Sequence, residues 1–185
     1  KPLGPIAYIL KARVTLLRDL GAALSPQNAF QFIQGLETLS LRIREHSKNA
    51  TRVADFLAQH PGIAKVNYPR LQKGAAARRA HHYLRGGYGG LVGLELAGGL
   101  EAGRAFVDAL KLFYHVANIG DVRSLAIHPA STTQSQLSPE EQAASGVSPG
   151  YVRLSVGIEH SDDILADLEQ ALKVATGKSS NAKAA

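Results

Sequence analysis

Residues 151–175 read YVRLSVGIEHSDDILADLEQALKVA, and they give the strongest indication of the fold. In its first eight residues apolar side chains alternate with small or polar ones, which is the pattern of a half-buried β-strand. The apolar positions are Val152, Leu154, Val156 and Ile158. Ser161-Asp162-Asp163 then caps a helix expected to reach about residue 175. Its apolar stripe is Ile164, Leu168, Ala171 and Ala175. Together, this strand and this helix predict a sheet with helices on one face.

The longest helix is expected upstream, between about residues 26 and 59. Ser25-Pro26 is its start signal, because serine accepts a backbone N–H at the N-cap and proline loses no hydrogen bond at the first helical position. His60-Pro61-Gly62 ends the pattern. A helix of this length measures roughly 50 Å and is predicted to connect two bodies. A shorter helix is predicted over residues 6–20, stopped by Gly21.

Shorter elements are predicted for the rest of the chain. Strands are expected at 63–68, 88–96, 115–119 and 124–128, and helices at about 100–112 and from Ser138. The basic stretch 70–87 is expected to form a loop with a short helix. The predicted class is α/β (α+β), with a connecting helix at 25–60, a small C-terminal domain at 61–176 and a disordered tail at 177–185.

Composition excludes several classes of protein. The 185 residues are 45% hydrophobic, enough for a core, and contain no cysteine, which excludes disulfides, thiolate metal sites and iron–sulfur clusters. No apolar run is long enough to span a membrane. The chain has no methionine, opens on Lys1-Pro2-Leu3-Gly4 without a signal peptide, and is expected to be a fragment or processed product of a cytoplasmic protein.

Positive charge is concentrated in residues 1–90, which hold 14 Lys and Arg against 4 Asp and Glu. Such a basic half can bind nucleic acid. However, Arg42, Arg44, Lys48 and Arg52 share a helical segment with an apolar stripe, and no aromatic residues are interleaved with them for base stacking. A solvated helix face is the favoured interpretation, so no nucleic-acid partner is predicted.

The sequence contains no complete motif for nucleotide binding, for metal binding or for a Ser-His-Asp catalytic triad. Thr176-Gly177-Lys178-Ser179 ends like a phosphate-binding loop, but Leu172 stands where that motif needs glycine. The glycines at 86–90 complete no dinucleotide fingerprint. The seven histidines offer no metal-ligand spacing on a helix face, and no nucleophile elbow is present. No metal site is predicted.

Arg153 is the most pointed candidate for a functional residue. It alternates with the core residues of its strand, so its side chain is expected on the opposite face of the sheet. The planar guanidinium binds carboxylates in bidentate fashion, which suits an anionic substrate. The alternative is a surface or interface arginine on the open face of the sheet. The small polar loops at 117–121 and 128–133 end neighbouring strands, where binding groups collect.

Several motifs together resemble the C-terminal part of the pyridoxal-phosphate-dependent Cys/Met-metabolism enzymes. They are Asn118-Ile119-Gly120-Asp121, Ser124-Leu125, His128-Pro129-Ala130-Ser131-Thr132-Thr133, the run from Val152 to Glu159, and Asp162-Asp163-Ile164. The runs 12–21, 24–26 and 34–39 are similar to the O-acetylhomoserine sulfhydrylase branch. The resemblance extends from the start of the chain to about residue 175.

The resemblance implies an aspartate-aminotransferase-like fold, with residues 1–24 as the end of a large cofactor-binding domain. It implies a step of methionine biosynthesis, in which O-acetyl-L-homoserine and sulfide give L-homocysteine and acetate. Arg153 matches the arginine that binds the substrate α-carboxylate, and Asn118 falls beside the substrate and cofactor. The implied partners are the N-terminal part of the same protein and further subunits of a homotetramer.

Two departures from the family pattern limit what this chain is expected to do. Gln134 stands where a histidine is common, so no proton or gating role is assigned there. No lysine has the Ser-x-Thr-Lys setting of the cofactor lysine. The chain alone is therefore expected to hold no pyridoxal phosphate covalently and to be inactive. The alternatives are a stand-alone binding or structural domain, and a cystathionine synthase, a cystathionine lyase or an O-succinylhomoserine sulfhydrylase.

Overall fold

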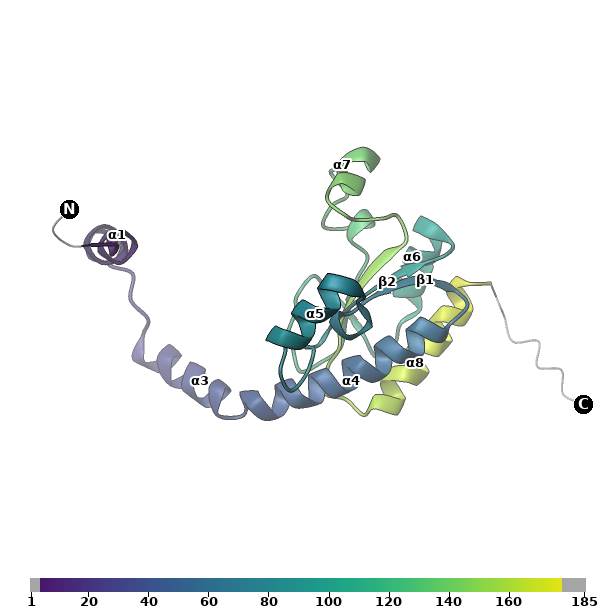
Figure 1. The fold of residues 1–185 in the computed structure, drawn as a ribbon, viewed down its shortest axis with the longest axis horizontal. Helices are drawn as coiled ribbons and strands as arrows, with labels where there is room; N and C mark the ends of the chain where they lie inside the picture. The colour runs from purple at the N-terminus through teal and green to yellow at the C-terminus, as the bar shows by residue number, and fades with distance from the viewer. Residues whose placement is uncertain (1–3, 178–185) are drawn as a thin grey trace, which may run out of the picture. The chain divides into compact units, whose positions relative to one another are not determined.

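A computed structural model describes residues 4–177 of the chain. The chain divides into two compact units, with the division between Ser40 and Leu41. Each unit is described by itself below, with the element labels of Figure 1. Apart from Gly177, the predicted disordered tail lies outside the described residues.

The first unit is helical. It contains α1 (Ala7–Leu10), the π-helix η1 (Lys11–Leu17), α2 (Arg18–Leu20) and α3 (Pro26–Glu37). The helix predicted over 6–20 is therefore confirmed, with a π-helical middle, and Gly21 ends it in the left-handed conformation, at φ 67°. The predicted cap is also confirmed, because Ser25 Oγ accepts the Asn28 N–H at 3.2 Å.

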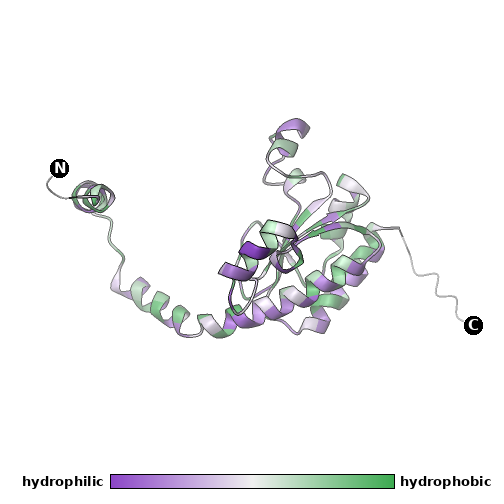
Figure 2. Cartoon of the chain, viewed as in Figure 1, coloured by the Kyte–Doolittle hydropathy of each residue, from purple (hydrophilic) through white to green (hydrophobic). Residues whose placement is uncertain are grey.

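No residue in these four helices is buried. Large apolar side chains are exposed instead, and Figure 2 shows apolar stretches along α3. The most exposed of them include Tyr8, Leu20, Phe32, Ile33 and Leu36. These side chains have no core to pack into within this unit, so the unit by itself presents an apolar surface.

The prediction of a single long helix over residues 26–59 is wrong. The structure has two helices, α3 and α4 (Leu39–Gln59), interrupted at Thr38, whose φ and ψ are −104° and 4°. Threonine is a weak helix former, and buried residues begin only at His46, so no core contact opposes a break at residue 38. The division into domains at residues 24, 60 and 176 stays a prediction.

The second unit holds a five-stranded sheet in the order β1-β2-β5-β4-β3. The strands are β1 (Ile63–Asn67), β2 (Leu91–Leu96), β3 (Tyr114–His115), β4 (Leu125–Ile127) and β5 (Tyr151–Ser155). All neighbours are antiparallel except β3 and β4. Each predicted strand is present but shorter than expected, and β3 has only two residues instead of the predicted 115–119.

Helices join the strands. They are α5 (Gly74–Tyr83), α6 (Gly99–Ala109), α7 (Pro139–Ala144) and α8 (Ser161–Ala175), with single 3-10 turns η2 (Pro69–Leu71) and η3 (Pro129–Ser131). The Ser138 cap of α7 is confirmed as a reciprocal pair, in which Ser138 Oγ accepts the Glu141 N–H and the Glu141 carboxylate accepts the Ser138 N–H.

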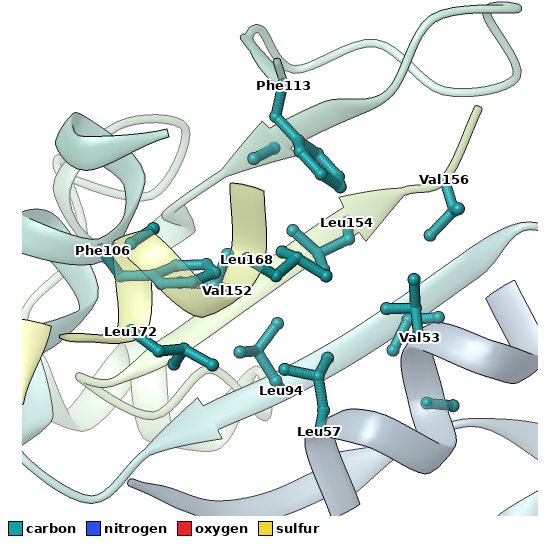
Figure 3. Packing of buried hydrophobic residues seen from close by; sticks show 14 of the residues in the cluster. Val53, Leu57, Leu94, Phe106, Phe113, Val152, Leu154, Val156, Leu168 and Leu172 are labelled. Atoms are coloured by element: carbon teal, nitrogen blue, oxygen red, sulfur yellow. The ribbon is translucent and has the colours of Figure 1, made fainter. Parts of the chain in front are cut away.

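One face of the sheet is the core. Side chains of β2 and β5 pack there against α4, α6 and α8, as Figure 3 shows for Leu57, Phe106 and Leu168. Helices on one face are therefore confirmed. Val152, Leu154 and Val156 are fully buried as predicted, but Ile158 is 37% exposed. Strand β5 ends at Ser155, so the alternation no longer directs Ile158 to the core.

Candidate functional site

The face of the sheet opposite the core carries Arg153. Its strand neighbours are Gly93 of β2 and Ile127 of β4. Gly93 leaves room for the ring of Tyr151, since a Cβ at residue 93 would lie 2.5 Å from the Tyr151 hydroxyl. The arginine therefore stands on the open face, next to an aromatic ring, as the alternation of the strand predicts.

The Arg153 guanidinium is held by a loop. Its Nη2 donates to the carbonyl oxygens of Ala117 at 2.7 Å and Asn118 at 3.3 Å. Its Nε is shielded from solvent and has no hydrogen-bond partner among the described residues. No described Asp or Glu forms an ion pair with this arginine. A guanidinium fixed by carbonyl groups without a carboxylate partner can bind the carboxylate of a ligand.

The 117–121 loop is itself anchored to the strand that carries Arg153. The Gly120 N–H donates to Ser155 Oγ at 3.0 Å. The backbone N–H and then the guanidinium of Arg123 bind the Asp121 carboxyl, which lowers its pKa. The Arg123 guanidinium also lies 4.7 Å from the centre of the Tyr114 ring. These contacts hold the carbonyl groups that orient Arg153.

Asn118 lies in this loop and contacts Arg153 through its backbone. Its carbonyl oxygen accepts from Arg153, while its exposed side-chain amide has no hydrogen-bond partner among the described residues. The two residues predicted to bind substrate are therefore brought together. Their roles toward a substrate stay predictions.

Glu159 ties the end of β5 to the same region, a role that the sequence did not reveal. Its carboxylate accepts the Ser124 N–H at 2.6 Å and the Ser124 hydroxyl at 2.9 Å, and Ser124 Oγ accepts the Gly157 N–H. A Cβ at residue 157 would lie 2.5 Å from the Val122 carbonyl oxygen. The feature of the sequence that could have indicated this role is Gly157, which stands two residues before Glu159 at the end of the predicted strand.

The 128–134 loop is held by hydrogen bonds within the loop and to residues 145 and 149. His128 is buried, and its Nε2 lies 2.7 Å from the Pro149 carbonyl oxygen, which can only accept. Nε2 therefore carries the proton, and Nδ1 accepts from the Ser131 hydroxyl at 2.7 Å. Gln134 Oε1 accepts from Ser145 at 2.9 Å, so its side chain ties the loop to the end of α7.

A pocket of about 400 Å³ lies on the open face beside Tyr151. Its charged and polar lining includes Lys65, Glu95, Gln142 and Ser148. Burial raises the pKa of the Tyr151 phenol, and the nearby positive charge of Arg153 acts in the opposite direction. Burial also raises the pKa of Tyr68, in the core.

These two tyrosines predict a loss of stability in alkali. In the unfolded chain both phenols have the ordinary pKa of 10.0, so the unfolded state releases their protons first as pH rises. The free energy of unfolding is expected to fall as pH rises past the ordinary phenol pKa of 10.0 and on through the raised pKa values of the folded state, as measured in urea titrations. Tyr151→Phe, which removes a hydroxyl without a partner among the described residues, should lessen that fall; an unchanged slope would contradict the assignment.

Metal and membrane features are absent from the described part of the chain. Residues 4–177 contain no group of three or more His, Asp or Glu side chains that could hold a metal ion. In the same range no helix combines the length and the apolar character needed to cross a bilayer.

The described residues do not fit a pyridoxal-phosphate site. Lys48 and Lys173 are paired with Glu45 and Glu169, and no described lysine follows a Ser-x-Thr sequence. Arg153, whose guanidinium is held by carbonyl groups and lacks a carboxylate partner among the described residues, suits the carboxylate of an amino acid. Among the described residues, Arg153 is therefore a candidate for carboxylate binding, and no chemical step is assigned to the cofactor.

Comparison with known proteins decides the family. The model of the Cys/Met metabolism PLP-dependent enzyme family matches residues 7–173. The chain belongs to this family. The resemblance noted in the sequence is thereby confirmed, and so is the dependence of the family on pyridoxal phosphate.

Relatives in the family share close sequence similarity with the chain. The O-acetyl-L-homoserine sulfhydrylase of Leptospira meyeri is 58% identical over 170 residues, covering 91% of this chain and 38% of the relative. O-acetyl-L-homoserine sulfhydrylase 1 of Thermus thermophilus is 52% identical over 169 residues, covering 91% and 40%. The chain thus spans about two fifths of the length of the relatives it matches.

A solved structure of the family confirms the predicted fold class. The crystal structure of an O-acetylhomoserine (thiol)-lyase from Campylobacter jejuni matches with a TM-score of 0.83 and 46% identity, over 93% of this chain and 41% of that one. That structure contains N'-pyridoxyl-lysine-5'-monophosphate. This chain therefore has the fold of the matching part of a pyridoxal-phosphate enzyme, which is consistent with the predicted aspartate-aminotransferase-like architecture.

Proposed function

We propose that this chain is the C-terminal part of an O-acetyl-L-homoserine sulfhydrylase. The reaction breaks the bond between the γ-carbon and the acetyl oxygen, releases acetate, and forms a bond from the γ-carbon to sulfide, giving L-homocysteine for methionine biosynthesis. Pyridoxal phosphate, held by the remaining part of the protein, supplies the electron sink. The relatives named for this reaction support the proposal.

Arg153 is proposed to bind the α-carboxylate of the substrate. The observation that carries this role is the guanidinium fixed by two carbonyl groups on the open face, without a carboxylate partner among the described residues. Such a group orients the amino acid and leaves its γ-carbon free to react elsewhere in the site. The exposed amide of Asn118 would lie at the same end of the substrate.

The remaining part of the protein is the proposed partner of this chain. The exposed apolar side chains of α1, η1, α2 and α3 would be buried against it, since none has a core within the described residues. A homotetramer and a cytoplasmic location are proposed with it, on the strength of the family alone.

A chimera tests the proposed reaction. This chain replaces the matching segment of the Leptospira meyeri sulfhydrylase, and acetate and homocysteine are measured with O-acetyl-L-homoserine and sulfide. We expect turnover within about tenfold of the parent enzyme. Turnover of O-succinyl-L-homoserine in place of the acetyl ester would indicate a succinyl-specific enzyme. Turnover of the substrate without sulfide would indicate a lyase. A chimera that folds and binds pyridoxal phosphate but turns over no substrate would overturn the proposal.

The 185-residue chain by itself is expected to be inactive. Because it lacks a lysine in the cofactor setting, borohydride reduction with pyridoxal phosphate should trap no adduct at one defined lysine, as read by peptide mass spectrometry. The chimera is the positive control for the same reaction. A single trapped lysine with turnover in the isolated chain would favour a self-sufficient enzyme instead.

A further inference from the structure

A second pocket lies on the outside of the sheet-bearing unit, around α5. Its volume is about 670 Å³, and its polar lining consists of Arg70, Arg78, His81, His82, Arg85 and Tyr88. This group is called the α5 basic pocket below. The residues belong to η2, α5 and the segment that follows α5, and none of them was needed for the proposed substrate site.

The helix brings its basic residues to one side. Arg78, His81 and His82 are separated by three and four positions, so they share one face of α5. Arg85 follows directly after the C-cap residue Leu84 and lines the same pocket. The floor includes Tyr88, whose ring packs edge-on against buried Tyr68.

The positive charge of this pocket is poorly compensated. The chain has no Asp or Glu between residues 56 and 94, and that interval holds six Lys and Arg. Arg70 forms an ion pair with Asp55, but neither Arg78 nor Arg85 has a carboxylate partner among the described residues. Gathering like charges is unfavourable unless an anion joins them.

We propose that the α5 basic pocket binds a small anion carrying two or more phosphate or carboxylate groups. Guanidinium groups match both kinds of anion with paired hydrogen bonds, and the volume lies in the range of small-ligand pockets. A polynucleotide is the less suitable ligand, because the Tyr88 ring packs against Tyr68 and the lining holds no other Phe, Tyr or Trp side chain for base stacking. This site does not depend on the proposed reaction at Arg153.

Binding of inorganic pyrophosphate and of citrate to the 185-residue chain tests the proposal. Titration calorimetry at low ionic strength should give one site per chain for at least one of the two anions. Arg78→Gln and Arg85→Gln should each weaken that binding about tenfold. The matched control is Arg79→Gln, which removes the same charge from the next residue of α5, outside the pocket lining, and should change the affinity less than about twofold.

These measurements distinguish a defined anion-binding site from general attraction of anions to a positively charged surface. All three arginines are exposed, so circular dichroism and thermal unfolding should show the variants folded like the parent chain. Equal losses from Arg78→Gln and Arg79→Gln would overturn the proposal, as would several weak anions per chain. Binding of a random oligonucleotide without binding of either small anion would overturn it in favour of a nucleic-acid surface.

Discussion

Replacing Arg153 by glutamine in the chimera is expected to lower kcat/KM for O-acetyl-L-homoserine by about two to three orders of magnitude. The substrate carboxylate would lose a pair of charge-assisted hydrogen bonds, together worth about 3–4 kcal/mol. The carbonyl groups of Ala117 and Asn118 would lose their donor as well, which frees the loop that orients the site. Initial rates at varied substrate concentration measure the effect.

Two further variants distinguish carboxylate binding from a structural role of Arg153. Arg153→Lys keeps the charge but lacks the planar fork, so it should retain part of the lost kcat/KM, mainly through KM. Arg104→Gln is the matched control: this exposed arginine of α6 pairs with Glu101 and should leave the rate unchanged. If Arg153→Gln matched Arg104→Gln, the carboxylate assignment would be wrong.

Local sequence rules predicted the elements that surround the site. The alternation over residues 151–155 gave both the strand and the side of the sheet on which Arg153 stands, because a strand has a strict period of two. The serine caps at residues 25 and 138 were equally readable, since their partners lie three residues away. Hydrogen bonds of this short range depend only on nearby residues.

Contacts between distant segments could not be read in the same way. Arg153 meets the Ala117 carbonyl across 36 residues, and that contact exists because β4 pairs with β5 and β3 lies beyond β4. The break at Thr38 also escaped the periodic pattern, which continues through it. A stripe of apolar residues indicates which face of a helix can be buried. It does not indicate where along the helix another part of the protein packs against that face.

Asp167 is a residue of this kind, since its role depends on a loop 54–56 residues away. It is buried on α8, and its carboxylate accepts the backbone N–H groups of Lys111 at 2.9 Å, Leu112 at 2.8 Å and Phe113 at 3.3 Å. Gln170 Nε2 donates to the same carboxylate at 3.0 Å and to the Ala109 carbonyl at 2.7 Å. Together they satisfy the backbone of the turn that leads from α6 to β3.

Asp167→Ala is therefore expected to lower the free energy of unfolding of the 185-residue chain by about 3–5 kcal/mol. Three backbone N–H groups would lose their acceptor in a partly buried turn, and each such group costs about 1–3 kcal/mol when it is shielded from water. Asp167→Asn keeps one acceptor oxygen and should lose about half as much. Urea unfolding followed by circular dichroism measures both.

The matched control for Asp167 is Glu169→Ala, which removes a carboxylate of the same helix that pairs only with Lys173 at the surface. It should change the free energy of unfolding by less than about 0.5 kcal/mol. Equal effects at residues 167 and 169 would mean that the turn finds other acceptors, such as water, when the carboxylate is removed. A larger loss from Asp167→Ala than from Asp167→Asn, with little loss from Glu169→Ala, would instead show that the Asp167 carboxylate stabilises the turn that leads from α6 to β3.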